Sequence, residues 1–135
     1  MSLRLAFFPL LLCALLSGCV AASQGQETQW FRYEICFGLS KDQGATVITQ
    51  DEWESFVDQE IVPTFPDGFT ILGATGYWRE QDATYREGSK VLMVVAPGPK
   101  EERLTTIKAL ADAYKERFRQ DSVLIIAQPA DVTFQ

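Results

Sequence analysis

The sequence predicts an α+β fold, a two-layer sandwich of the ferredoxin-like type in which a four-stranded antiparallel sheet carries two helices on one face. Its 135 residues, 47% hydrophobic and 22% charged, suffice for one globular domain with a single core. Four segments have the pattern of strands and two have apolar residues at helical spacing, in the order βαββαβ. Because βαβ crossovers are right-handed, we expect both helices on the same side of the sheet.

The first half of the domain is predicted to contain one strand and one helix. Residues 30–37 alternate, so that one face carries Phe31, Tyr33, Ile35 and Phe37 and the other carries Arg32, Glu34 and Cys36. Thr49, followed three residues later by Glu52, has the pattern of a helix-capping box. The helix that begins there is expected to end at Pro63 and to bury a stripe that includes Trp53, Phe56 and Ile61.

The second half is predicted to contain two strands, a long helix and a final strand. The two strands cover residues 69–78 and 90–96, joined by a polar connection over residues 80–88. Pro97-Gly98-Pro99 then precedes a helix whose buried stripe is Leu104, Ile107, Ala111, Tyr114 and Phe118. Residues 122–127, apolar at almost every position, are expected to form the last strand.

Residues 1–18 are predicted to be a lipoprotein signal peptide rather than part of the fold. Arg4 precedes an apolar stretch over residues 5–16, which is shorter than the roughly 20 residues of a membrane-spanning helix. Leu16-Ser17-Gly18-Cys19 resembles a bacterial lipobox, which implies that Cys19 becomes an N-terminus carrying acyl chains such as palmitate. The alternative is an ordinary secretory signal cleaved near residues 21–23.

A lipid on Cys19 would hold the domain at a membrane without spanning it. Residues 19–29 are mostly small and polar after the cysteine and are expected to be a flexible tether, which leaves residues 30–135 as the single domain. Two or more acyl chains bind a membrane stably. Val20 occupies the position where, in bacterial lipoproteins, an Asp favours retention in the inner membrane. The resemblance to a lipobox therefore implies the periplasmic side of the outer membrane.

Charge and residue usage exclude several classes of function. The net charge of −6 opposes nucleic-acid binding, and the absence of His excludes His-based catalytic triads and His-ligated metals. We expect no metal and no cofactor. Cys36 remains alone once Cys13 has left with the signal peptide and Cys19 is lipidated. It is expected to be a small buried residue, with an intermolecular disulfide or a reactive thiol as alternatives.

Two groups of residues are weak candidates for chemistry. Glu34, with Arg32 and Tyr77, would be the catalytic group, because a carboxylate on the sheet face away from the helices can act as a base if that face is covered. The alternative is an ion pair between Glu34 and Arg32, Arg79 or Lys90. Binding candidates are Trp78, Arg79, Glu87 and Lys90, which together with Tyr77 could form an aromatic, charged wall. Alternatively, Trp78 closes the core or a subunit contact.

An ordered set of short motifs carries a family resemblance. The motifs are Phe37-Gly38, Glu52-Trp53-Glu54-Ser55-Phe56-Val57, residues 62–70, Gly76-Tyr77-Trp78 and residues 86–92. With these motifs the chain resembles the DUF3574 family of small exported bacterial proteins, which are often lipoproteins. The resemblance spans nearly all of the mature domain. It implies export and a single domain, and it implies no activity or substrate.

We therefore expect a membrane-anchored envelope lipoprotein whose domain is a non-catalytic binding or interaction module. The rival hypothesis is a small cofactor-free enzyme of the dimeric α+β-barrel type, in which Glu34 with Arg32 or Tyr77 transfers protons; no catalytic motif supports it directly. A ligand-sized pocket around Glu34 would favour the enzyme, and a dry apolar seam would favour the module. The ligand could be a small molecule or another envelope protein.

The last two strands point to self-association. Both faces of each strand are apolar. Leu92, Val94, Leu124 and Ile126 are therefore expected to need shielding from water, whichever way the strands pair. A homodimer through the sheet face not covered by helices would supply it. The alternatives are a C-terminal segment in which Val132 and Phe134 fold back across the sheet, or contact with a different envelope protein.

Overall fold

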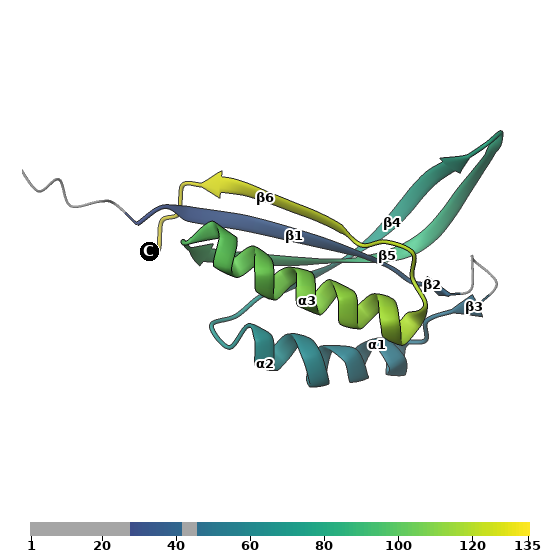
Figure 1. Ribbon diagram of the computed structural model, residues 1–135, viewed down its shortest axis with the longest axis horizontal. Helices are drawn as coiled ribbons and strands as arrows, with labels where there is room; N and C mark the ends of the chain where they lie inside the picture. Colours follow the sequence, from purple (N-terminus) through teal and green to yellow (C-terminus); the bar gives the residue numbers. More distant parts are fainter. Residues whose placement is uncertain (1–27, 42–45) are drawn as a thin grey trace, which may run out of the picture.

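The computed structural model describes residues 28–41 and 46–135 and confirms the predicted fold class (Figure 1). The main strands are β1 (Trp30–Gly38), β4 (Thr70–Glu80), β5 (Ala83–Pro97) and β6 (Leu124–Ala130). A short ribbon of β2 (Ser40–Lys41) and β3 (Thr46–Val47), which the sequence did not predict, follows β1. The helical elements are α1 (Gln50–Phe56), a π-helix (Val57–Ile61), α2 (Val62–Thr64) and α3 (Lys100–Phe118).

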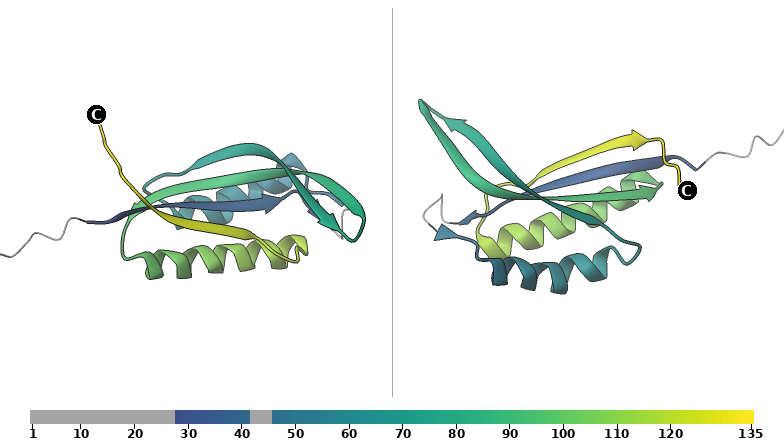
Figure 2. Two further views of the ribbon diagram at one scale, coloured as in Figure 1. Left: turned by 90° about the horizontal axis from the view of Figure 1, so that it is seen from above. Right: turned by 180° about the vertical axis from the view of Figure 1, so that it is seen from behind.

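The four main strands form one antiparallel sheet in the order β4-β5-β1-β6. β1 lies in the centre and pairs with β5 along its whole length, from Trp30 opposite Pro97 to Gly38 opposite Ser89. Both helical segments lie on the same side of this sheet (Figures 1 and 2). We call the opposite side, which none of the described helices covers, the open face.

The core lies between the sheet and the helices. Its largest fully buried side chains are Tyr33, Tyr114, Phe37, Phe56, Ile35, Ile61, Leu92 and Ile107. Aromatic rings from three elements meet at its centre: the ring centroids of Phe37 and Tyr114 are 4.5 Å apart, and those of Phe56 and Tyr114 are 5.1 Å apart. The buried Tyr114 hydroxyl donates a hydrogen bond of 2.6 Å to the carbonyl of Gly38, so its polar end is satisfied.

The first helical segment begins as predicted and ends one residue later than expected. Thr49 and Glu52 form the capping box: the Thr49 side chain accepts from the Glu52 N–H, and Glu52 Oε2 accepts from the Thr49 N–H at 2.9 Å. Glu52 Oε1 also accepts from Lys41 Nζ at 2.5 Å, which joins the helix start to β2. The π-helix inserts into the segment, and Trp53, Phe56 and Ile61 are buried as expected.

The predicted polar connection over residues 80–88 is wrong, because these residues mostly continue the two strands. β4 and β5 stay in register from Thr70 opposite Met93 to Glu80 opposite Ala83, and only Gln81 and Asp82 make the turn. Residues 75–88 extend past the end of β1, and we call them the arm. The arm bends away from the helices (Figures 1 and 2). It has no buried face, so it lacks the apolar alternation from which strands are predicted.

The predicted signal peptide and nearly all of the predicted tether, including Cys13 and Cys19, lie outside the described residues. Among the helices that the structure does describe, none has the length and apolar character needed to cross a membrane. The buried residues of the described part of the chain form one hydrophobic core.

Candidate functional site

The open face carries the residues that alternate with those of the core. Its large apolar side chains keep much of their surface in solvent: Leu124 is 59% exposed, Leu72 47%, Val95 40% and Ile126 39%. The expectation that Leu92 and Val94 need cover on this face is wrong. Both point into the core, with 0% and 3% exposed, because the strand phase turns their neighbours outward instead.

Arg32 and Glu34, two of the three catalytic candidates, form an ion pair on the open face. Arg32 Nη2 lies 2.6 Å from Glu34 Oε1, and the two side chains are 42% and 25% exposed. An ion pair with Arg32 is one of the alternatives to a catalytic role that the sequence left open for Glu34. Because the carboxylate charge is already balanced by a neighbour beside water, the arrangement fits a structural pair better than a proton-transfer group.

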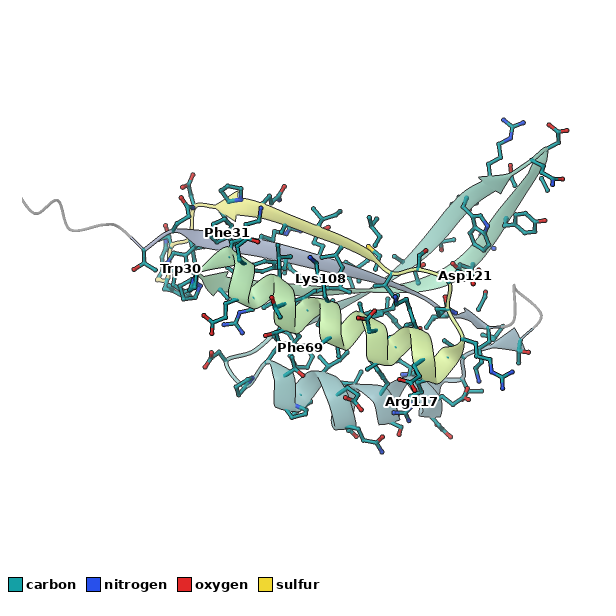
Figure 3. The ribbon with its side chains drawn as sticks, in the orientation of Figure 1. Trp30, Phe31, Phe69, Lys108, Arg117 and Asp121 are labelled. Atoms are coloured by element: carbon teal, nitrogen blue, oxygen red, sulfur yellow. The ribbon has the colours of Figure 1, made fainter. Side chains whose placement is uncertain are left out.

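A hollow of about 750 Å³ lies where β5 runs past the start of β4. It is at the end of the sheet that holds Trp30, which is labelled in Figure 3. Arg32 is the one candidate residue that lines it, and the C-terminal residues 130–134 form part of its wall. The rings of Trp30 and Phe134 meet edge to face, with centroids 5.7 Å apart. The C-terminal segment therefore packs at this end of the sheet, and it leaves Leu124 and Ile126 uncovered.

A second hollow, of about 460 Å³, lies at the foot of the arm and brings three candidate residues together. Tyr77, Trp78 and Glu87 line it from the arm. The rest of its wall consists of Cys36, Gly38, Ser40, Gly76, Ser89, residues 119–122 and Leu124. Asp121, in the connection between α3 and β6, is visible near the foot of the arm in Figure 3. We call this space the arm-base hollow.

Small residues make room for the Glu87 side chain in the arm-base hollow. A Cβ atom at Gly38 would lie 2.6 Å from Glu87 Oε1, so the carboxylate occupies the place that a side chain at position 38 would take. A Cβ atom at Gly76 would lie 3.0 Å from Ser89 Oγ. This contact explains the glycine in the Phe37-Gly38 motif, because a larger residue at position 38 would displace the Glu87 carboxylate.

A backbone hydrogen bond from β2 holds the Glu87 carboxylate. Its Oε2 accepts from the Ser40 N–H at 3.2 Å. None of the ion pairs between described residues involves Glu87. The pKa of the Tyr114 hydroxyl in the core is raised, mainly because Tyr114 is buried and to a smaller extent because the negative charge of Glu87 is nearby.

Trp78 is held in place on the arm by a cross-strand partner. It lies opposite Tyr85, and the two rings stack with centroids 5.4 Å apart and planes 15° apart. Trp78 lines the arm-base hollow and remains 40% exposed. The hypothesis that Trp78 closes the core is therefore wrong, and an aromatic wall beside Glu87 is what the structure shows.

The remaining candidates lie elsewhere. Arg79 is exposed further along the arm, opposite Thr84, and Lys90 lies opposite Phe37; neither lines the arm-base hollow. Cys36 is half-buried on the open face rather than buried, and burial followed by the nearby Glu34 charge raises the pKa of its thiol. No group of three potential metal ligands occurs within the described ranges.

Sequence reasoning missed the residues that close the arm-base hollow from the side of α3. Arg119 ends α3 in a left-handed conformation, with φ 54°, and residues 120–122 turn the chain towards β6. The tertiary fold brings these residues close to the arm. No local sequence pattern indicates that they line the hollow.

The sheet with one covered and one open face, and the arm with a hollow at its foot, define the class of protein: a small α+β domain of the ferredoxin-like type. The chain belongs to the DUF3574 family. The model of that family, described as a protein of unknown function, matches residues 32–134.

Solved structures with a similar fold come from other proteins. One is a phage SAM lyase in complex with S-methyl-5′-thioadenosine, with a TM-score of 0.59 and 20% sequence identity over 74% of this chain and 81% of that chain. Another is CutA from Synechococcus elongatus, with a TM-score of 0.47 and 10% identity over 76% of this chain and 78% of that chain. The lyase shares the fold with this chain. The comparison with curated proteins returns no match.

Proposed function

We propose that this protein is a lipid-anchored envelope protein, attached through Cys19 on the periplasmic side of the outer membrane, whose domain is an interaction module. The module self-associates through its open face. The lipobox-like residues before Cys19 support the anchor, and membership in a family of unknown function leaves the activity open. The observation that carries the proposal is the row of exposed apolar side chains on the open face.

This row crosses all four strands of the sheet. In the strand register, Leu72 lies opposite Val91, Val91 opposite Cys36, and Cys36 opposite Leu124. Ile126 lies next along β6, opposite Glu34. A continuous apolar row on an uncovered sheet marks a contact surface more clearly than isolated apolar residues do.

A second copy of the same chain suits this surface. Arg32 and Glu34 neutralise each other within one copy, so two identical faces can meet around a two-fold axis without repulsion between like charges. Anchored copies also share one side of one membrane, which raises the local concentration at which they meet. The C-terminal segment contacts Trp30 at one end of the sheet and leaves Leu124 and Ile126 exposed for such a contact.

Light scattering on the chain from Gln24 onward tests the self-association. We expect a dimer in the micromolar range, and Leu124→Lys is expected to halve the mass while circular dichroism stays unchanged, because a charge is placed in the apolar row. Val62→Lys is the matched control, since Val62 is 48% exposed on the helical side. A monomeric wild type, or an unchanged mass in Leu124→Lys, would contradict the proposal.

The anchor is tested by metabolic labelling with a fatty acid. The wild-type protein is expected to carry the label, and Cys19→Ser is expected to lose it and to accumulate as unprocessed precursor, because the thiol is the acceptor of the lipid. A Cys19→Ser protein that is processed normally and keeps its location would show that an ordinary secretory signal is present instead.

An enzyme is a second candidate, favoured by the position of Glu87. Unlike Glu34, this open-face carboxylate lines a hollow and has no ion-pair partner among the described residues. The phage protein of similar fold is a SAM lyase, so SAM is the first substrate to test. Release of S-methyl-5′-thioadenosine by the wild type and not by Glu87→Gln would support this candidate. No release from the wild type would exclude this activity.

A further inference from the structure

We propose that the arm-base hollow binds a small organic cation of the substituted-ammonium class, with its charge beside Glu87 and its apolar groups against Trp78. The proposal goes beyond self-association and needs no turnover of the bound molecule. It rests on the charges, the aromatic wall and the room in this hollow.

The charges around the hollow favour a cation. Its acidic and basic wall residues are two carboxylates, Glu87 and Asp121, and one guanidinium, Arg119. Glu87 receives one N–H, from Ser40, and takes part in none of the ion pairs between described residues. A half-buried carboxylate that forms no ion pair with the described residues gains more from an arriving cation than a carboxylate that is already paired.

The aromatic wall favours an organic cation over a metal ion. Trp78 is fixed by its stack on Tyr85, so its indole ring is already in place when a ligand arrives. The face of an indole attracts substituted ammonium groups through its quadrupole. A metal ion would need several ligating side chains together, and the described residues contain no group of three.

The hollow has room for such a molecule. Its volume of about 460 Å³ is kept open by Gly38, Gly76 and Ser89, and it falls within the range of roughly 300–1,000 Å³ that is typical of ligand sites. The larger hollow at the other end of the sheet lacks this pattern, because its charged wall residues are two arginines, Arg32 and Arg103, against Asp67 and Asp131.

Calorimetry with choline tests the proposal. The full-length lipidated protein is held in an uncharged maltoside detergent and titrated with choline, or with the uncharged isostere in which carbon replaces the quaternary nitrogen. We expect choline to bind about tenfold more tightly than the isostere, because the two molecules share shape and differ in charge. Glu87→Gln is expected to remove this difference, since its amide oxygen still accepts from the Ser40 N–H while the charge is lost.

Two further variants complete the test. Trp78→Leu keeps an apolar side chain and is expected to weaken choline binding severalfold, whereas Glu116→Gln, an exposed carboxylate on α3 outside the hollow, is expected to leave binding unchanged. Absence of choline binding, equal binding of the isostere, or full affinity in Glu87→Gln would overturn the proposal. If Trp78→Leu does not fold, the charge comparison alone decides. None of these readouts depends on SAM cleavage. Because Cys36 and Leu124 belong both to the hollow and to the apolar row, the mass of each variant is measured by light scattering, so that a change in oligomeric state is told apart from a loss of choline binding.

Discussion

The covered face and the open face of the sheet are built from the same strands but differ in what stabilises them. In β1, Tyr33, Ile35 and Phe37 are fully buried beneath the helices, whereas Arg32, Glu34 and Cys36, which alternate with them, stay partly exposed. Aromatic rings from sheet and helices pack together on the covered face. Along the central strands, the open face carries exposed aliphatic side chains and the Arg32–Glu34 ion pair.

This difference shows that position relative to the helices, and not residue type, decides which apolar groups hold the fold. Val94 and Val95 are consecutive valines in β5, yet Val94 is 3% exposed and Val95 is 40% exposed. The covered residues contribute to folding stability, because burial removes their apolar surface from water. The exposed ones remain free to contribute to binding.

The largest expected effect is on the covered face. Trp53→Ala is expected to lower the free energy of unfolding by about 3–5 kcal/mol, because Trp53 is 3% exposed and its loss leaves a cavity beside Phe37 and Tyr114. Urea denaturation followed by circular dichroism measures the change. A loss below about 1 kcal/mol would show that the covered face is less tightly packed than the structure indicates.

An intermediate effect is expected at the start of the first helix. Thr49→Ala removes the side chain that accepts from the Glu52 N–H, which leaves a helix-end donor to solvent. The free energy of unfolding is expected to fall by about 1 kcal/mol, also measured by urea denaturation. Thr49→Ser keeps the oxygen and is the matched control. Equal stability of the two variants would mean that the cap contributes nothing to the covered layer.

Substitutions on the open face are expected to change the free energy of unfolding very little. Leu124→Ala is expected to change the free energy of unfolding by less than about 0.5 kcal/mol in dilute protein, because the side chain is 59% exposed. Leu92→Ala, in the covered phase, is the contrasting variant, with an expected loss of about 2–5 kcal/mol. Similar losses in the two variants would erase the distinction between the faces.

The same two faces explain which parts of the fold could be predicted from the sequence. The alternation in residues 30–37 shows one apolar face, and the structure confirms that phase. The phase of Leu92 and Val94 could not be derived, because β5 is apolar on both faces there and its register depends on pairing with β1. The arm was predicted as a loop because neither of its faces is buried.

The candidate site was predictable only in part. Trp78 and Glu87 were expected to lie near each other, and the hairpin register brings them to one hollow. Arg79 and Lys90 were placed with them because they are close in sequence, but Lys90 has the phase of the core-facing Leu92 and lies opposite Phe37. Gly38 and residues 119–122 come from distant elements, so their part in the hollow follows from the tertiary fold.

The smallest expected effect is a pH dependence on the covered side. Hydrogen bonds from Lys41, and then from the Thr49 backbone, lower the pKa of Glu52 from 4.5 to about 2. The folded pKa is below the unfolded one, so the stabilisation is complete above about pH 4.5 and is lost as the pH falls towards 2.

Glu52→Gln keeps the capping pattern but not the charge. Wild type is therefore expected to lose more stability than Glu52→Gln between pH 5 and pH 2.5 in urea titrations, with Glu116→Gln behaving like wild type. Parallel losses in wild type and Glu52→Gln would show that the Lys41–Glu52 contact does not persist in solution.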